Sequence, residues 1–271
     1  TQVKALKVNQ LQALSTTQIQ AIETADLKGM TVSQVAAFST SQVQALTTAQ
    51  LNALTVAELN ALSDTQLQSL STTQVSSLNA ASTAKLKAAQ VAALSTAQVA
   101  ALTTAQIKSL AATAVTALGS DQVASLTSDQ VIAFNNTQLA ALETADLVAM
   151  TTENIAALET KQMAAFSNAQ ISSLTTDQIV ALETEDLVML KGQQVVALTS
   201  EQFLAMTTDQ IQSLTAGQIS TIETQDLAAL SSDQIQALSS TQLPALTTYQ
   251  FKNLTTDTLV AFTTDQIQAI S

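Results

Sequence analysis

The chain has 271 residues, with nine lysines and no arginine against twenty-one carboxylates, for a net charge of −12, and it contains no histidine or cysteine. This composition excludes imidazole and thiolate catalysis, the usual ligands of zinc, haem and iron–sulfur clusters, and disulfides. A strongly acidic chain without arginine binds nucleic acid and anionic membranes poorly, so we expect no nucleic-acid partner.

The hydropathy pattern argues against disorder and against membrane insertion. Apolar residues make up 46% of the chain and charged residues 11%, which is not the composition of a disordered protein. Ser, Thr or Gln interrupts the apolar residues every few positions, so no run approaches the roughly 18 residues of a spanning helix. No signal peptide is visible.

An eight-residue repeat organises the sequence from end to end. Thr1 to Leu6 read as positions 3 to 8 of an octad, residues 7–270 form 33 complete octads without insertion or deletion, and Ser271 reads as position 1 of another. Typical octads are Ser15-Thr-Thr-Gln-Ile-Gln-Ala-Ile22 and Thr175-Thr-Asp-Gln-Ile-Val-Ala-Leu182. We therefore expect one repeat domain over residues 1–271 that is part of a longer array.

A period of eight fits neither a long helix nor a β-solenoid. Eight residues overshoot two α-helical turns by about 80°, so the apolar positions would spiral around a continuous helix. Position 5 is apolar in 32 octads and position 8 in all 33, and residues of opposite parity face opposite sides of a strand. The abundance of Ala, Leu and Gln favours helix as well.

One short helix per octad remains. Position 4 is Gln in 24 octads, and Ser or Thr at position 1 with Gln at position 4 has the spacing of a capping box. The cap can be assigned to position 1 or to position 2. Asp recurs at position 3, in the first helical turn, where the helix dipole favours a negative charge. Pro244 at position 6 costs less in such a short helix than deep in a long one.

Helices this short need packing to be stable. Positions 5 and 8 share a helix face that can point to the axis of a coil, and the small residue at position 7, which is Ala, Ser or Gly in 29 octads, allows neighbouring coil turns to approach. The pattern predicts an all-α solenoid in the form of an elongated rod. We assume about four or five octads in each coil turn, a number that the pattern does not determine.

Two stretches depart from the consensus and are candidate joints, one near residues 79–94 and one near residues 111–126. Octad Asn79–Leu86 carries Thr83 at position 5 and Lys85 at position 7, and Lys87 follows. Octad Ala111–Leu118 is followed by Gly119.

A longer period is superimposed on the octads. The motif Glu-Thr-x-Asp-Leu occurs four times, always in one phase of a 40-residue period: Glu23–Leu27, Glu143–Leu147, Glu183–Leu187 and Glu223–Leu227. One interpretation is duplication of a 40-residue block. The alternative is that five octads close one or two coil turns, so that these carboxylates line up along one edge.

No catalytic, cofactor-binding or metal site is predicted, and we expect no enzyme. Glu183, Glu185 and Asp186 could form a carboxylate pair, but a solvated helix start explains them better. Residues 119–271 hold seventeen acids and three lysines, which makes calcium the most reasonable metal hypothesis, although no EF-hand loop is present. Tyr249 at position 3 is expected to be exposed, whereas the phenylalanines occupy positions 5 and 8 and are expected in the core: Phe38, Phe134, Phe166, Phe203, Phe251 and Phe262.

The octad Ser/Thr-Ser/Thr-x-Gln-Ile/Leu/Val-x-Ala-Leu resembles tandem arrays of large bacterial secreted or cell-surface proteins, which are described as adhesin-like or as haem-utilisation or adhesion proteins. The resemblance covers the whole chain and implies an extracellular or cell-surface location. The lack of His and Cys speaks against a haem role for this segment.

The leading functional hypothesis is a structural spacer, whose length matters more than any one residue and whose partners are neighbouring repeats of a longer chain. The alternative is a solenoid module that binds a host or surface protein or a glycan through exposed positions 2, 3 and 6. Weak calcium binding and ice binding by threonine ladders are minor variants.

Overall fold

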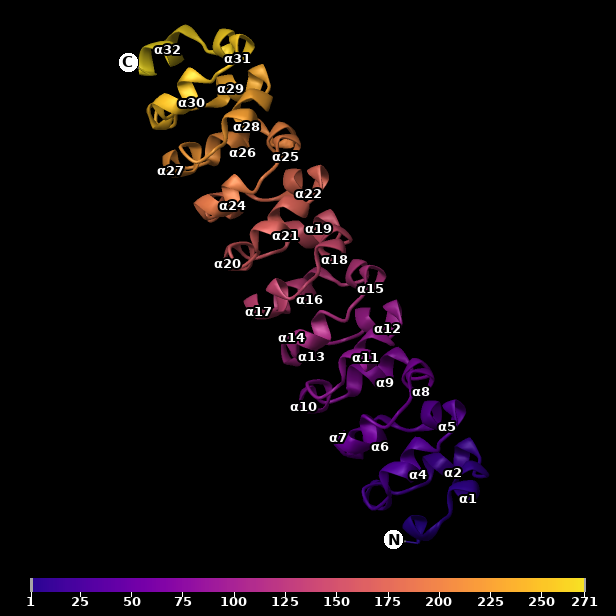
Figure 1. Cartoon of the computed structure of the whole chain (residues 1–271). Coiled ribbons are helices and arrows are strands. Elements are labelled where there is room, and N and C mark those ends of the chain that lie inside the picture. The colour runs from indigo at the N-terminus through magenta and orange to yellow at the C-terminus, as the bar shows by residue number, and fades with distance from the viewer. Residues whose placement is uncertain (1, 271) are drawn as a thin grey trace. The chain divides into compact units, whose positions relative to one another are not determined.

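The computed structural model describes residues 2–270, which form two compact units, one that extends to Leu142 and one that starts at Glu143 (Figure 1). Within residues 2–270 every regular element is a short helix and no β-strand occurs. No helix in this range is long and apolar enough to span a membrane. The prediction of an all-α fold is therefore confirmed.

The helices of the first unit are η1 (Val3–Ala5), α1 (Val8–Gln12), α2 (Thr16–Gln20), α3 (Thr24–Leu27), α4 (Val32–Ala36), α5 (Thr40–Ala45), α6 (Thr48–Ala53), α7 (Val56–Leu59), α8 (Asp64–Gln68), α9 (Thr72–Ser77), α10 (Ala80–Thr83), α11 (Ala88–Ala92), α12 (Thr96–Ala100), α13 (Thr104–Ser109), α14 (Ala112–Val115), α15 (Ser120–Ala124), α16 (Ser128–Ala133) and α17 (Asn136–Ala140). The helices of the second unit are α18 (Thr144–Val148), α19 (Thr152–Ala156), α20 (Thr160–Met163), α21 (Asn168–Ser173), α22 (Thr176–Ala181), α23 (Thr184–Val188), α24 (Gly192–Val196), α25 (Ser200–Ala205), α26 (Thr208–Ser213), α27 (Ala216–Ile219), α28 (Thr224–Ala229), α29 (Ser232–Ala237), η2 (Leu243–Ala245), α30 (Thr248–Lys252), α31 (Thr256–Ala261) and α32 (Thr264–Ile270).

Almost every octad forms one α-helix, and where position 1 is Ser, Thr or Asn its side chain caps that helix. In α2 the Ser15 backbone is extended, and the Ser15 Oγ accepts a hydrogen bond of 3.2 Å from the Gln18 amide. In return the Ser15 amide donates to the Gln18 Oε1 at 2.8 Å, which completes the predicted capping box. Position 8 is extended again, as at Leu54. Positions 8 and 1 together form the linker between successive helices.

The two apolar positions form the core of each unit. Most side chains at position 5, such as Val43 and Ile179, are fully buried, and most at position 8, such as Leu46 and Leu182, are nearly so. Exceptions at position 5 lie near the C-terminus, where Leu259 and Ile267 are exposed. Because these side chains leave water together, packing stabilises helices that would not form alone. Helix–helix contacts repeat at a fixed interval of three helices, as in α2 with α5, α22 with α25 and α26 with α29. Each unit is therefore a solenoid stabilised by neighbouring coil turns.

The structure contradicts the assumption of four or five octads in each coil turn. A helix packs against the helix three octads later, and hydrogen bonds between coil turns join residues 25 to 31 positions apart, as in Gln12 with Ala37 and Gln42 with Leu11. One coil turn thus contains between three and four octads. With only two apolar side chains from each octad, a wider ring would leave its centre unfilled, so close packing favours the narrower coil.

Pro244 changes its octad more than expected. No α-helix forms there; a turn and the 3-10 helix η2 take its place. Proline has no amide hydrogen to continue the helical ladder. The rest of the octad keeps its contacts, because the Ser239 amide still donates to the Gln242 Oε1 at 2.9 Å and Leu243 is still buried.

The irregular stretches 79–94 and 111–126 both lie inside the first unit. Thr83 replaces the usual apolar residue and is buried, with its hydroxyl donating to the Asn79 carbonyl at 3.2 Å. The helices there keep the packing interval of the array, as α10 contacts α13 and α11 contacts α14. A joint at either stretch stays a prediction.

Candidate functional site

The glutamine at position 4 links each coil turn to the previous one. In Gln50 the Oε1 accepts from the Thr47 amide at 2.8 Å, while the Nε2 donates to the carbonyls of Ile19, Gln20 and Ile22 at 2.9, 3.2 and 2.8 Å. These carbonyls lie at the end of the helix four octads earlier, where a helix leaves its acceptors unsatisfied. One buried amide therefore caps the start of its own helix and the end of another.

This contact recurs along both units. Gln106 in the first unit donates to Val75 and Leu78, both at 2.8 Å, and Gln210 in the second donates to Ile179 and Leu182, both at 2.8 Å. We call the series the glutamine ladder. The sequence pattern predicted its first half, the capping box. The donation across the coil could not be predicted, because it depends on the number of octads in a turn.

A second set of contacts lies on the exposed side of the coil. The Asn52 Nδ2 at position 6 donates to the Ser77 carbonyl at 2.7 Å, and its Oδ1 accepts from the Asn79 amide at 2.8 Å. The hydroxyl of Thr116, also at position 6, donates to the Ala141 carbonyl at 3.0 Å. Exposed polar residues at position 6 therefore also join coil turns.

The Glu-Thr-x-Asp-Leu motif places an aspartate where the ladder has glutamine. Asp146, Asp186 and Asp226 are all buried, whereas Glu183 and Glu185 are exposed. Burial therefore separates Asp186 from Glu183 and Glu185, the residues considered as the source of a carboxylate pair. The motif recurs with a period of 40 residues, which is more than one coil turn and less than two. Successive motifs therefore do not lie above one another, and the hypothesis of an acidic edge is wrong. Duplication of a 40-residue block remains the interpretation of the period.

The buried aspartates have unusual acid–base properties. Burial raises the pKa of Asp186 to about 6, with the charges of Glu183 and Glu185 adding to the effect and a hydrogen bond from the Glu183 backbone opposing it. Burial also raises the pKa of Asp226, against the effect of a 2.6 Å hydrogen bond from the Ser200 hydroxyl. Among residues 2–270 no three acidic side chains come together in a way that could hold a metal ion.

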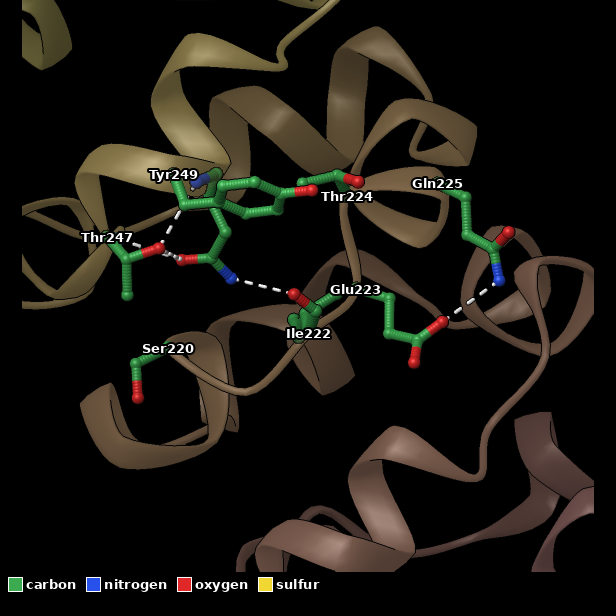
Figure 2. Close-up of a pocket in the computed structure, with 8 residues that line it drawn as sticks. Ser220, Ile222, Glu223, Thr224, Gln225, Thr247 and Tyr249 are labelled. Carbon is green, nitrogen blue, oxygen red and sulfur yellow. Dashed lines mark hydrogen bonds between the residues drawn. The ribbon is translucent and has the colours of Figure 1, made fainter.

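A cavity of about 370 Å³ lies in the second unit beside the only tyrosine (Figure 2). It is lined by residues between Ser220 and Gln225 and by Thr247, Tyr249 and Gln250. Tyr249 is 71% exposed, as predicted, and its ring extends toward Thr224. The Gln225 Nε2 donates to the Glu223 carboxylate at 3.1 Å on the same segment. The cavity therefore combines an aromatic face with polar groups.

Other candidate residues have structural roles. Five of the six phenylalanines are buried as predicted, and Phe251 is half-buried, with its ring stacked on Phe262 at a centroid distance of 6.5 Å. Threonine hydroxyls at position 1 are occupied by capping, as at Thr47. A second cavity, of about 510 Å³ in the first unit, is lined by residues 92–96 and 117–122 and has no aromatic side chain.

A family profile described as the ALTTAQ repeat matches five segments that together make up about two thirds of the chain: residues 19–56, 83–112, 139–176, 179–216 and 219–256. The last three begin 40 residues apart, which is also the spacing of the last three Glu-Thr-x-Asp-Leu motifs. No curated protein sequence matches the chain.

Proposed function

Because the chain belongs to the ALTTAQ repeat family and forms a structural repeat region, we propose that it acts as a spacer, an extension rod within a bacterial secreted or cell-surface protein of the adhesin kind. The observation that supports this role is the glutamine ladder. An octad with glutamine at position 4 supplies donors to an earlier turn, and its own carbonyls accept from a later turn, so added octads prolong the coil without a new kind of contact.

The surface location is supported by the octad pattern, which resembles arrays of secreted and cell-surface proteins. On this proposal the partners of the region are the neighbouring repeats of a longer chain, and no enzymatic activity is assigned to it.

The spacer role is tested by small-angle X-ray scattering of nested variants that differ by seven octads. We expect the maximum dimension to increase in proportion to the number of octads. A dimension that stops increasing while the chain stays monomeric and helical would contradict a spacer.

The location is tested by shaving intact source cells with the protease Glu-C, which cleaves after the glutamates of the chain. Peptides from this region should be released from intact cells under conditions in which a cytosolic marker is retained. Release only after lysis would contradict a surface location.

The Tyr249 cavity favours a second candidate function, the binding of a glycan. Sugar rings stack on exposed aromatic faces and hydrogen-bond to carboxylate, amide and hydroxyl groups, all of which line this cavity. A glycan array probed with the chain and with Tyr249→Ala tests it. Binding that the substitution abolishes supports the glycan site, and no binding, or equal binding by both, contradicts it.

A further inference from the structure

Asp186 stands at position 4 of its octad, where the glutamine ladder has a donor. When its carboxyl group is ionised, it has no hydrogen to donate. Its side chain is 2% exposed, and its Oδ2 has no hydrogen-bond partner. In the octads on either side, Gln178 donates to the Met150 carbonyl at 2.9 Å and Gln194 to the Phe166 carbonyl at 2.8 Å, both 28 residues earlier. By the same 28-residue register, the carbonyl that corresponds to position 186 is that of Leu158.

Among the residues that the structure describes, no backbone amide donates to the Leu158 carbonyl. An ionised carboxylate opposite a carbonyl adds a buried charge next to the negative end of a dipole, which is unfavourable at low dielectric. A protonated carboxyl group carries one O–H and can donate as the glutamine amide does. Only the protonated form of Asp186 can therefore take the role of the missing glutamine.

The charges around α23 favour the protonated form. Its own octad carries Glu183 and Glu185 and no lysine. Lys161 on the packed helix α20 and Lys191, which follows the octad, are both exposed. The charged groups on the helices packed against α23, and on the helix that precedes Leu158, are all exposed: Glu159 and Lys161 at α20, Asp209 on α26 and Glu153 on α19. No cation is buried beside the carboxylate to stabilise its charge.

Asp226, at the same place in a later octad, accepts a side-chain hydrogen bond that Asp186 lacks. Its carboxylate accepts a hydrogen bond of 2.6 Å from the Ser200 hydroxyl, 26 residues earlier on the preceding coil turn. Thr160 has the corresponding place for Asp186, yet the Asp186 Oδ2 accepts no hydrogen bond. Ionised Asp226 therefore has a hydroxyl donor from the preceding coil turn, whereas ionised Asp186 has the hydrogen bond from the Glu183 backbone and no donor at Oδ2.

We propose that Asp186 is a proton-controlled bridge between coil turns. With a proton on Oδ2 it donates to the preceding turn, and without that proton the bridge is lost and octad 183–190 loosens. This inference does not depend on the spacer role or on the glycan site.

The direction of the pH effect follows from the two states of the chain. The pKa of Asp186 is about 6 in the folded chain against 3.8 in the unfolded reference. Between these values the folded chain binds the proton and the unfolded chain does not, so stability decreases as pH rises. The stabilisation is complete below pH 3.8 and is lost as pH rises through 6.

The first test compares the full chain with Asp186→Asn, which has nearly the same shape and keeps a donor at every pH. Urea-unfolding midpoints of the two proteins should agree near pH 4, and the variant should become the more stable as pH rises to 7.5. A control, Asp177→Asn, removes an exposed acid at position 3 and should show no such growing difference. A difference that is independent of pH for Asp186→Asn would overturn the proposal.

The second test locates the effect. Hydrogen exchange of amides 183–190, corrected for intrinsic rates, should lose at least about tenfold protection between pH 5 and pH 7.5 relative to amides 207–214, since one pKa unit corresponds to a factor of ten. The loss should be absent in Asp186→Asn. Equal loss in both proteins, or none in either, would contradict a proton-controlled bridge.

Discussion

Gln178 and Met150 are 28 residues apart in the chain, yet the Gln178 Nε2 lies 2.9 Å from the Met150 carbonyl oxygen. The same amide also donates to Leu147 at 3.0 Å, and its Oε1 accepts from the Thr175 amide at 3.0 Å. A single side chain thus joins the start of α22 to the end of α18.

Replacing Gln178 by Glu should therefore destabilise the chain near neutral pH. The cap acceptor is kept but the donors are lost, and a buried charge then faces carbonyls, at a cost of about 1–3 kcal/mol. Urea unfolding followed by circular dichroism measures the change. Gln212→Glu is the control, because Gln212 is exposed and should tolerate the charge within about 0.5 kcal/mol. Equal effects of the two changes would contradict a special role for position 4.

Ala114→Gln should stabilise the first unit. Ala114 is buried at position 4, and its octad begins at Ala111 without a side-chain cap. A glutamine there supplies a cap acceptor and reaches carbonyls four octads earlier, for a gain of about 1–2 kcal/mol. A higher melting temperature checks this expectation, and a lower one would show that this octad does not follow the ladder geometry.

Pro244→Ala should restore an α-helix in the octad Ser239–Leu246. The alanine amide can join the helical ladder that proline interrupts, with a gain of about 1 kcal/mol or more. Far-ultraviolet circular dichroism should show a small increase in helicity together with a higher melting temperature. An unchanged spectrum would mean that the 3-10 turn is set by packing against its neighbours.

Modular stacking predicts unequal effects of two chain-length changes. An alanine inserted between Val99 and Ala100 changes the spacing of the two core residues of one octad, Val99 and Leu102. Because a large core side chain then loses its burial, the free energy of unfolding should decrease by about 2–5 kcal/mol. Deletion of the whole octad Ser95–Leu102 keeps every remaining octad intact and should cost much less. Melting temperatures measure both changes. Similar losses from the two would argue against a repeating core.

The sequence predicted local structure well because local structure depends on neighbouring residues. Ser15 and Gln18 lie three positions apart, so their capping box follows from spacing alone. Val43 and Leu46 share a helix face for the same reason, and both are buried. The choice between positions 1 and 2 for the cap needed the structure, which shows an extended backbone at position 1.

The relation between coil turns could not be predicted. It depends on the backbone angles of the linker at residues such as Leu46, and small changes there alter the number of octads in a turn. The ladder from Gln42 to Leu11 and Leu14 follows only once that number is known. For the same reason the acids of the 40-residue motif had two open interpretations, and the burial of Asp186 was not foreseen.

Chemical cross-linking tests the coil of three to four octads most directly, because the chain has no cysteine and introduced thiols are unique. The Asn52 Oδ1 and the Asn79 Nδ2 lie 3.2 Å apart on successive coil turns, although 27 residues separate them. We expect dibromobimane to join the two thiols of the double variant Asn52→Cys/Asn79→Cys efficiently within one molecule, and not those of Asn52→Cys/Gln68→Cys, which lie only two octads apart. Efficient cross-linking of the pair at residues 52 and 68, with none of the pair at residues 52 and 79, would contradict a coil of three to four octads per turn.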